Sequence, residues 1–258
     1  TLSHSSAASD VYKRQDNIAI LYDRGAIKGA LIVAPKGVYK NWDQIEFPTH
    51  MPEHIEYTKV LWEPNITKRK QAELDTLFED NHKLKILIMN VEAFSTSKGL
   101  DFAHSFLNIF VGRALFGIDE STTIKNPTAK RTKNILKIGD LAKYRRILTG
   151  SPVTKSPLYL FSQCEFLDPH HLGHASYYSF RARYANMVKR NFGGRQVQLV
   201  VSYRRLDELA DILDKFSYRV LKEDCLDLPE KIFTKRYVEL TKEQDKAYKQ
   251  MKQMALAM

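Results

Sequence analysis

The sequence predicts an α/β protein in which helices flank a parallel sheet. The first observation is a set of four short apolar runs, each of which ends in a polar residue or in Gly or Pro. The runs are continuous rather than alternating, as is typical of strands buried on both faces. The second observation is that longer polar segments separate the runs. We expect strands at 30–35 (ALIVAP), 85–90 (KILIMN), 114–120 (ALFGIDE) and 145–151 (RRILTGS).

The segments between these strands predict crossover helices, and the clearest lies at 66–81, where the spacing of apolar residues is helical. In a parallel sheet of this kind, the loops that carry function follow the carboxyl ends of the strands. Those loops begin at Pro35-Lys36, Met89-Asn90, Asp119-Glu120 and Thr149-Gly150-Ser151.

Beyond Pro157 the pattern changes to a helical extension. The segments 157–169 and 204–217 predict amphipathic helices, and 218–221 and 231–240 predict strands. Thr241, with Glu243 two residues on, predicts the start of a final helix. The Gly-Gly pair in 191–200 predicts either a turn between a helix and a strand or a phosphate contact.

The chain has 258 residues, an apolar content of 43% and a net charge of +10. This charge indicates a polyanionic partner, with a solvated basic surface as the alternative. No apolar run approaches the roughly 18 residues that a membrane span needs. These features favour the cytoplasm of a bacterial or phage-infected cell, or the nucleus of a eukaryote. The first fifteen residues are small and polar, without core-facing periodicity, and we expect a non-native leader there.

Cysteine and histidine spacing does not favour a metal site. Cys164 and Cys225 lie far apart without a CxxC pattern, which argues against a zinc site or a disulfide framework. His170, His171 and His174 form a local cluster without a Cys or acidic partner, so we expect an ordinary turn there.

The pair Asp119-Glu120 has two interpretations. An Asp at the end of a buried strand can hold Mg²⁺ through water, while the neighbouring Glu activates a water molecule. Alternatively, the Asp caps the following helix and the Glu lies on the surface. The next segment, 121–155, has nine Lys or Arg residues against a single Asp. Within it, Thr149 and Ser151 have hydroxyls that could bond to water or phosphate near Glu120.

Five motifs in order resemble the SWI/SNF-type (Snf-two) branch of the superfamily-two helicase-like ATPases. They are LIVAPKGVYKNW, ILIMNVEAF, IDESTTIKN, RRILTGSP and the tail that runs from YRVLKEDCLDLPEK to LTKEQDKAY. The resemblance implies a RecA-like lobe of the P-loop NTPase type, with ATP and Mg²⁺ as cofactors. It also implies double-stranded DNA, either bare or within nucleoprotein, as the partner of a translocase.

The resemblance assigns roles to individual residues. Asp119 is similar to the Mg²⁺ residue of motif II and Glu120 to its water-activating residue, although Ser-Thr replaces the usual Ala/Gly-His after them. Thr149, Gly150 and Ser151 resemble motif III, which couples hydrolysis to lobe movement. The DNA-facing positions would be Pro35, Lys36, Asn41, Trp42, Lys125 and Asn126, with a place in the core as the alternative for Trp42.

No glycine in the sequence is followed by lysine, so the GxxxxGK[ST] phosphate loop is not found. We therefore expect an amino-terminally truncated first lobe at 16–225, then a linker and the start of a second lobe at 226–258. Such a fragment would be inactive alone, because the parent's second lobe is also missing. A basic DNA-binding module without ATPase activity is the alternative. An RNA helicase lobe is disfavoured by LTGSP at 148–152 and by LPEK at 228–231.

Overall fold

The computed structural model describes residues 17–193, 195–219 and 234–256. The chain divides into two compact units, Thr1–Tyr218 and Arg219–Met258. The predicted leader at 1–15, the predicted domain boundary at 225/226 and Cys225 all lie outside the described residues. No helix of the described ranges is long and apolar enough to cross a membrane.

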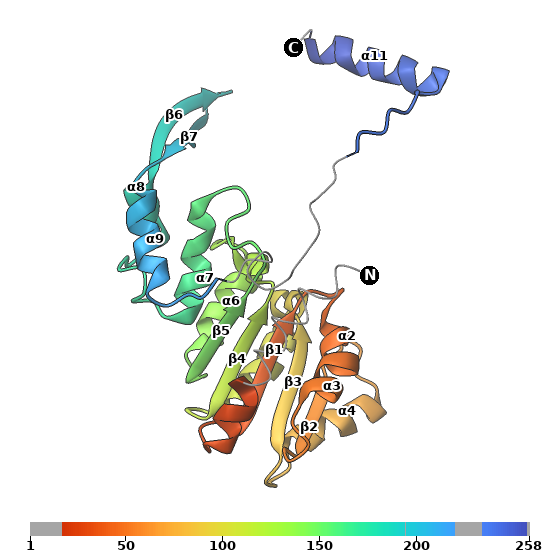
Figure 1. Ribbon diagram of the computed structural model, residues 1–258, viewed down its shortest axis with the longest axis vertical. Helices are drawn as coiled ribbons and strands as arrows, with labels where there is room; N and C mark the ends of the chain where they lie inside the picture. Colours follow the sequence, from red (N-terminus) through yellow and green to blue (C-terminus); the bar gives the residue numbers. More distant parts are fainter. Residues whose placement is uncertain (1–16, 194, 220–233, 257–258) are drawn as a thin grey trace. The chain divides into compact units, whose positions relative to one another are not determined.

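The first unit is built on a five-stranded sheet in the order β2-β3-β1-β4-β5, in which every pair of neighbours is parallel (Figure 1). The predicted α/β class is therefore confirmed. The four apolar runs form four of the strands, and the fifth was missed. The strands are β1 (Gly29–Ala34), β2 (Tyr57–Leu61), β3 (Leu84–Asn90), β4 (Ala114–Asp119) and β5 (Tyr144–Leu148).

β1, β3 and nearly all of β4 are buried along their whole length because helices cover both faces of the sheet. Side chains such as Leu31 and Phe116 face one core, and side chains such as Ile32 and Leu115 face the other. This alternation within continuous apolar runs explains why the sequence showed no period of two. β2 lies at the edge of the sheet, is only partly buried and mixes polar and apolar residues (YTKVL), so no continuous apolar run marked it. β5 is also a partly buried edge strand, but it leads into the LTGSP motif.

Helices flank this sheet and extend beyond it (Figure 1). A helical segment covers 17–23, and a π-helical turn, Trp42–Glu46, joins the two short helices after β1. The other helices of the first unit are α2 (Tyr39–Asn41), α3 (Phe47–His50), α4 (Lys68–Asp75), α5 (Ser97–Ile109), α6 (Lys130–Gly139), α7 (Leu160–Leu167), α8 (Tyr177–Tyr184) and α9 (Leu206–Asp214). The second unit contains α11 (Lys242–Leu256).

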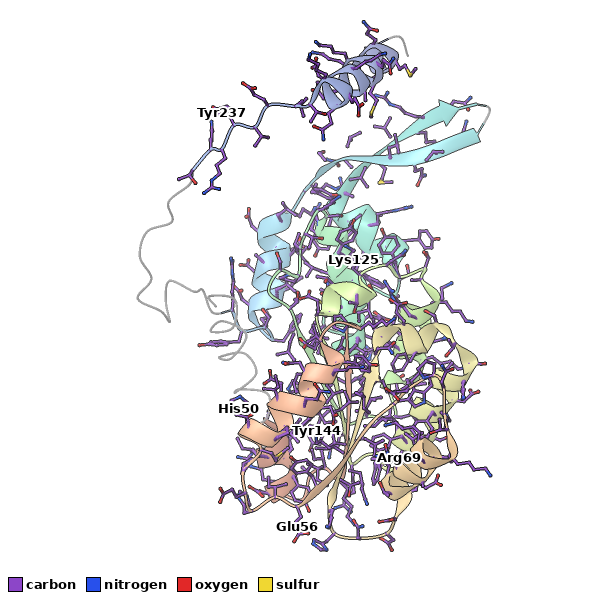
Figure 2. The ribbon with its side chains drawn as sticks, turned by 90° about the vertical axis from the view of Figure 1, so that its right-hand side faces the viewer. His50, Glu56, Arg69, Lys125, Tyr144 and Tyr237 are labelled. Atoms are coloured by element: carbon purple, nitrogen blue, oxygen red, sulfur yellow. The ribbon has the colours of Figure 1, made fainter. Side chains whose placement is uncertain are left out.

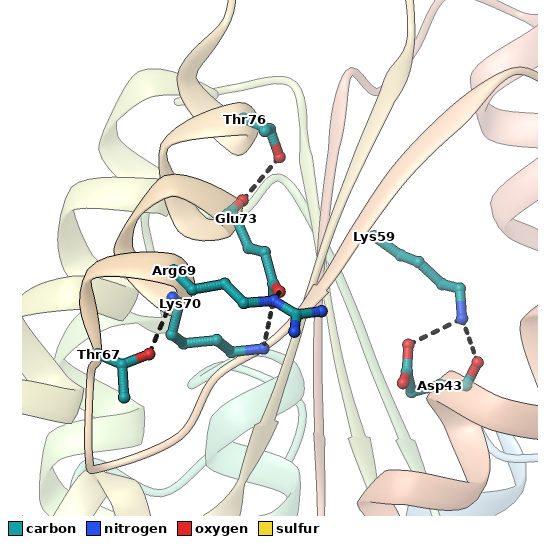
Figure 3. Close-up of polar contacts among 7 residues, drawn as sticks. All are labelled: Asp43, Lys59, Thr67, Arg69, Lys70, Glu73 and Thr76. Atoms are coloured by element: carbon teal, nitrogen blue, oxygen red, sulfur yellow. Dashed lines mark hydrogen bonds and ion pairs between the residues drawn. The ribbon is translucent and has the colours of Figure 1, made fainter.

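The helix predicted at 66–81 is shorter in the structure because polar side chains stop it at both ends (Figure 3). At the start, the hydroxyl of Thr67 accepts a hydrogen bond from the backbone N–H of Lys70 at 3.2 Å. At the end, the hydroxyl of Thr76 donates to the carbonyl of Glu73 at 2.7 Å. The chain then continues as a 3₁₀ turn, Thr76–Phe78.

The helical extension after β5 has a core of its own, in which Leu158, Phe161, Phe180 and Leu209 are buried. Helices predicted at 157–169 and 204–217 are present as α7 and α9. Cys164 lies in this core, and burial raises the pKa of its thiol to about 12. The thiol is therefore protonated and unreactive at neutral pH.

Two local predictions are corrected. The Gly-Gly pair does not join a helix to a strand, because Gly193 lies between two strands, β6 (Ala185–Phe192) and β7 (Arg195–Tyr203). The described parts of the predicted strands at 218–221 and 231–240 have no strand structure. The final helix begins after Thr241 as predicted, and Thr241 exchanges hydrogen bonds of 3.1 and 3.3 Å with Gln244.

Candidate functional site

Asp119 and Glu120 mark an abrupt change of backbone direction. Asp119 is the last residue of β4, and Glu120 follows with φ at 54° and ψ at 67°, in the left-handed region. Such a conformation is uncommon for a residue other than glycine and costs on the order of 1–3 kcal/mol. It ends the strand and starts the 3₁₀ turn Ser121–Ile124. The carboxylate of Glu120 is therefore aimed by a strained backbone, as is common at functional sites.

Two hydroxyls hold the carboxylate of Glu120. Its Oε1 atom accepts hydrogen bonds from Thr149 Oγ1 at 2.7 Å and from Thr122 Oγ1 at 2.6 Å. Thr149 follows β5, and the pairing of Asp119 with Leu148 brings the ends of β4 and β5 side by side. The structure thus brings together two predicted site residues that lie 29 positions apart in the chain.

Asp119 is bonded from a different direction. Its Oδ2 atom accepts a hydrogen bond from the indole N–H of Trp42 at 2.8 Å. Trp42 is 2% exposed and packs against Phe47, with ring centroids 5.6 Å apart. Trp42 therefore lies in the core, and its one polar atom is directed at the predicted Mg²⁺ residue. A cavity of about 150 Å³ opens beside this contact and is lined by Ile32, Gly117, Asp119 and Arg146 among others.

The buried hydroxyl of Ser121 links the β4 turn to the helical extension. Ser121 Oγ donates to Gln163 Oε1 at 2.6 Å, and both residues are fully buried. Gln163 Nε2 in turn donates to the carbonyls of Pro152 at 3.0 Å and Tyr159 at 2.8 Å. One glutamine on α7 thus ties the turn after β4 to the loop after β5. This contact explains a serine at the position where the motif usually has Ala or Gly.

Replacing Ser121 by Ala should destabilise the first unit by about 1–3 kcal/mol, because Gln163 Oε1 would lose the hydroxyl that donates to it in a buried site. Urea unfolding followed by circular dichroism measures the loss. Ser97→Ala is the matched control, since Ser97 is exposed and makes no side-chain hydrogen bond within the described residues. Equal unfolding midpoints for the two variants would contradict a structural role for the Ser121–Gln163 bond.

The other predicted site residues are distributed around the same edge of the sheet. Lys36 lies just after β1, the strand that pairs with β4. The side chain of Lys36 is exposed, and the neighbouring Pro35 is partly buried. Asn41 Nδ2 donates to Glu46 Oε1 at 2.7 Å, so this amide is engaged inside the protein. Gly150 and Ser151 are exposed, and the Ser151 N–H donates to Thr149 Oγ1 at 3.2 Å.

Lys125 and Asn126 form a separate group on the segment after the β4 turn. The Lys125 ammonium lies over the ring of Tyr159, 4.8 Å from its centroid. Figure 2 labels Lys125 at the end of the sheet opposite Tyr144, the first residue of β5. Asn126 Oδ1 accepts from the backbone N–H and the hydroxyl of Thr128, at 3.0 and 2.8 Å, which shapes a tight turn. Within the described residues, neither side chain forms a hydrogen bond or an ion pair with Glu120, whose partners are Thr122 and Thr149.

Some basic side chains of the segment 121–155 form hydrogen bonds or ion pairs within the protein, and others are exposed to solvent. Arg131 donates to the carbonyl of Thr123 at 2.9 Å and pairs with Glu92, and Arg145 pairs with Asp140 at 2.9 Å. The exposed basic residues of the segment are Lys130, Lys133, Lys137, Lys143, Arg146 and Lys155. The charges of these six side chains are open to solvent.

The described residues do not meet the requirements of a metal site built from protein side chains alone. Within the described ranges, no three His, Cys, Asp or Glu side chains come together in a way that could hold a metal ion. His171 stacks on Phe216 with centroids 4.1 Å apart, and His174 packs edge-on against Phe180. These contacts agree with an ordinary turn at the histidine cluster.

Sequence reasoning missed three residues of this site: Thr122, Ser121 as a buried donor, and Gln163. Thr122 could not be assigned because its bond to Glu120 depends on the left-handed backbone of Glu120. Gln163 looked like one polar position of an amphipathic helix, although it is fully buried. The polar Ser-Thr that replaces the usual residues after Asp-Glu was the signal that could have drawn attention to this turn.

Comparison with known proteins gives consistent results. A family model described as "SNF2-related domain" matches residues 8–258. The chain is 34% identical over 116 residues to mouse DNA annealing helicase and endonuclease ZRANB3, covering 45% of this chain and 11% of that protein. It is 26% identical over 224 residues to the putative ATP-dependent helicase/translocase YwqA of Bacillus subtilis. These residues cover 86% of this chain and 21% of that protein.

The chain is also similar to a second curated protein from a eukaryote and to a solved structure. The TATA-binding protein-associated factor MOT1 of Saccharomyces cerevisiae is 35% identical over 134 residues, which cover 51% of this chain and 7% of that protein. Among solved structures, the Sulfolobus solfataricus SWI2/SNF2 ATPase core in complex with dsDNA is similar, with a TM-score of 0.52 and 24% identity. That similarity covers 89% of this chain and 42% of that one. The chain therefore spans well under half the length of the relatives it matches.

Proposed function

This chain belongs to the SNF2-related domain family, and on that premise we propose that it forms part of an ATP-driven motor on double-stranded DNA. The observation that carries the proposal is the bond between Glu120 and Thr149 at the ends of β4 and β5. It joins a candidate water-activating carboxylate to a loop whose conformation can change with the state of the nucleotide. The solved SWI2/SNF2 core in complex with dsDNA supports the choice of duplex DNA as partner.

Within this proposal, Asp119 and Glu120 divide the chemistry. A bound Mg²⁺ would neutralise negative charge on the transferred phosphate, and it keeps several waters while binding through one or two carboxylates. The carboxylate of Asp119, oriented by the Trp42 N–H, fits such a water-mediated contact. Glu120 would take the proton of the attacking water through its second oxygen, while Thr122 and Thr149 hold Oε1. Gly150 and Ser151 would follow Thr149 when the loop moves.

The DNA-facing residues are proposed from their exposure as well as from the motif. Lys36 is exposed at the carboxyl edge of the sheet and can neutralise a phosphate. Lys125 and Asn126 lie within the basic segment 121–155 and are also proposed to bind DNA. Pro35 and Asn41 would shape the loop that presents Lys36. For Trp42, burial favours an indirect role through Asp119 over direct contact with DNA.

A basic DNA-binding module without ATPase activity is the second candidate, because none of the eleven glycines precedes a lysine. The two candidates are separated by ATP hydrolysis with and without duplex DNA. For the 258-residue chain itself we expect salt-sensitive DNA binding and negligible turnover. For a longer protein with a Gly-Lys-Thr loop upstream of residue 16, we expect DNA-stimulated turnover, which for typical enzymes is roughly 1–10 s⁻¹ or more.

Two results would contradict these expectations. Turnover at that level by the 258-residue chain alone would contradict the expectation that the chain is an inactive fragment. A longer protein that has the loop but shows no DNA-stimulated hydrolysis would favour the binding module. Sequencing the source DNA across codons 1–16 decides whether such a loop lies in frame.

A further inference from the structure

The hairpin formed by β6 and β7 is a two-stranded sheet separate from the five-stranded sheet. It continues directly from α8 and leads into α9, and Figure 1 shows it as a ribbon that extends beyond these two helices. The two helices that flank the hairpin are joined to each other, because Arg183 on α8 donates two hydrogen bonds to Glu208 on α9, at 3.0 and 2.6 Å. The Arg183 guanidinium lowers the pKa of Glu208 to about 2, so this pair stays ionised at neutral pH.

The strand register divides the ribbon into two different faces, because neighbouring side chains along a strand point to opposite sides. Toward the tip, one face has an ammonium and amides, and the other has apolar side chains and a guanidinium. The cross-strand pairs are Lys189 with Gln198 and Asn191 with Gln196 on the first face, which Met187 and Val200 continue toward α8, and Val188 with Leu199 and Arg190 with Val197 on the second. Both faces are open to solvent: the four polar residues of the first face are exposed, and Val188, Val197 and Leu199 on the second are 37–42% exposed.

The ribbon lies in a segment whose charge is entirely positive. From Pro169 to Leu206 the sequence has seven Lys or Arg residues and no Asp or Glu. Some of them are engaged: Arg204 donates to the carbonyls of Arg183 at 3.1 Å and Ala182 at 2.6 Å. Lys189 and Arg190 are exposed and make no polar contact in the described part of the chain. Their charge is available to an anionic partner.

We propose that the β6–β7 hairpin is a second DNA-binding element, which enters the major groove of a B-form duplex. The major groove is about 12 Å wide and admits a two-stranded ribbon, and ribbon strands lie about 4.8 Å apart. Lys189 and Arg190 contact phosphates at the two sides of the groove. Asn191 and Gln196 carry the amide groups that pair with base edges, above all with adenine. The deep, narrow major groove of A-form RNA excludes such a ribbon.

This inference rests on the proposed function, since duplex DNA is the partner in both, but it places a contact outside the motif residues. The test is the affinity of the 258-residue chain for a fluorescein-labelled duplex DNA, measured by anisotropy over a range of salt concentrations. Replacing Lys189 and Arg190 by Ala should weaken binding roughly tenfold or more and make the plot of log K against log salt less steep by about 1.8. Asn191→Ala with Gln196→Ala should weaken binding without changing that slope.

Lys68→Ala with Arg69→Ala is the matched control, because it removes the same charge from exposed positions on α4. We expect this pair to leave both affinity and slope near those of the unaltered chain, and far-UV circular dichroism should be equal for all variants. If the variant with Lys189→Ala and Arg190→Ala has the same DNA affinity and salt slope as the α4 variant, the inference is wrong. The ribbon face with Val188, Val197 and Leu199 would then be assigned to a protein partner. An amide variant with full affinity, or duplex RNA bound as tightly as DNA, overturns the groove placement. If the unaltered chain binds no duplex DNA, it is the proposed function that fails.

Discussion

Replacement of Glu120 by Gln is expected to slow DNA-stimulated ATP hydrolysis by roughly 10²–10⁴-fold, the range that a general base contributes. The measurement is made in the longer protein with a phosphate loop, by phosphate release at saturating duplex DNA. The amide keeps an oxygen that can accept from Thr122 and Thr149, so the turn after β4 should keep its shape. What it loses is the group that takes a proton from water.

Glu92→Gln is the matched control for this experiment. Glu92 lies just after β3 at the same edge of the sheet, but it is exposed and pairs with Arg131 rather than with a strand-end hydroxyl. We expect its variant to hydrolyse ATP at close to the unaltered rate. DNA affinity should be unchanged in both variants, which separates a chemical defect from a binding defect. An unaltered rate in the Glu120 variant would remove this residue from water activation.

Replacement of Phe116 by Ala is expected to destabilise the first unit by about 3–5 kcal/mol, a value typical of a fully buried phenylalanine. Phe116 lies in the middle of β4 and is 0% exposed. Its ring meets Phe166 of α7 edge-on at 4.8 Å and stacks with Phe94 at 6.3 Å. It therefore joins the sheet, the turn after β3 and the helical extension in a single core.

Phe78→Ala provides the comparison, since Phe78 is 37% exposed and its ring meets that of Phe102 edge-on, with centroids 5.8 Å apart. Urea unfolding should show a clearly smaller loss for this variant. Because domains have only about 5–15 kcal/mol of stability, the Phe116→Ala variant could unfold at room temperature. Phe116→Leu, which keeps most of the apolar volume, should then give a measurable loss in the same direction. Equal losses at positions 78 and 116 would contradict the central place of Phe116.

The family and the α/β architecture could be predicted from the sequence. Three of the four apolar runs form β1, β3 and β4, which were predicted because strands buried on both faces need apolar residues at nearly every position. The fourth run forms β5, a partly buried edge strand that was also marked by its order among the motifs. The motifs are short and local, so their order along the chain was visible without coordinates. The edge strand β2 and the β6–β7 hairpin were not predicted, because partly exposed strands mix polar and apolar residues and lack this signature.

The detailed geometry of the candidate site was decided by the tertiary structure. Asp119-Glu120 and Thr149 could each be picked out from the sequence, but their contact depends on the register of β4 against β5. The bond from Trp42 to Asp119 joins residues 77 positions apart, and no local pattern predicts it. Propensity and periodicity act over a few residues, whereas a hydrogen bond needs two atoms within about 3 Å of each other. Only the packing of the whole sheet sets that distance.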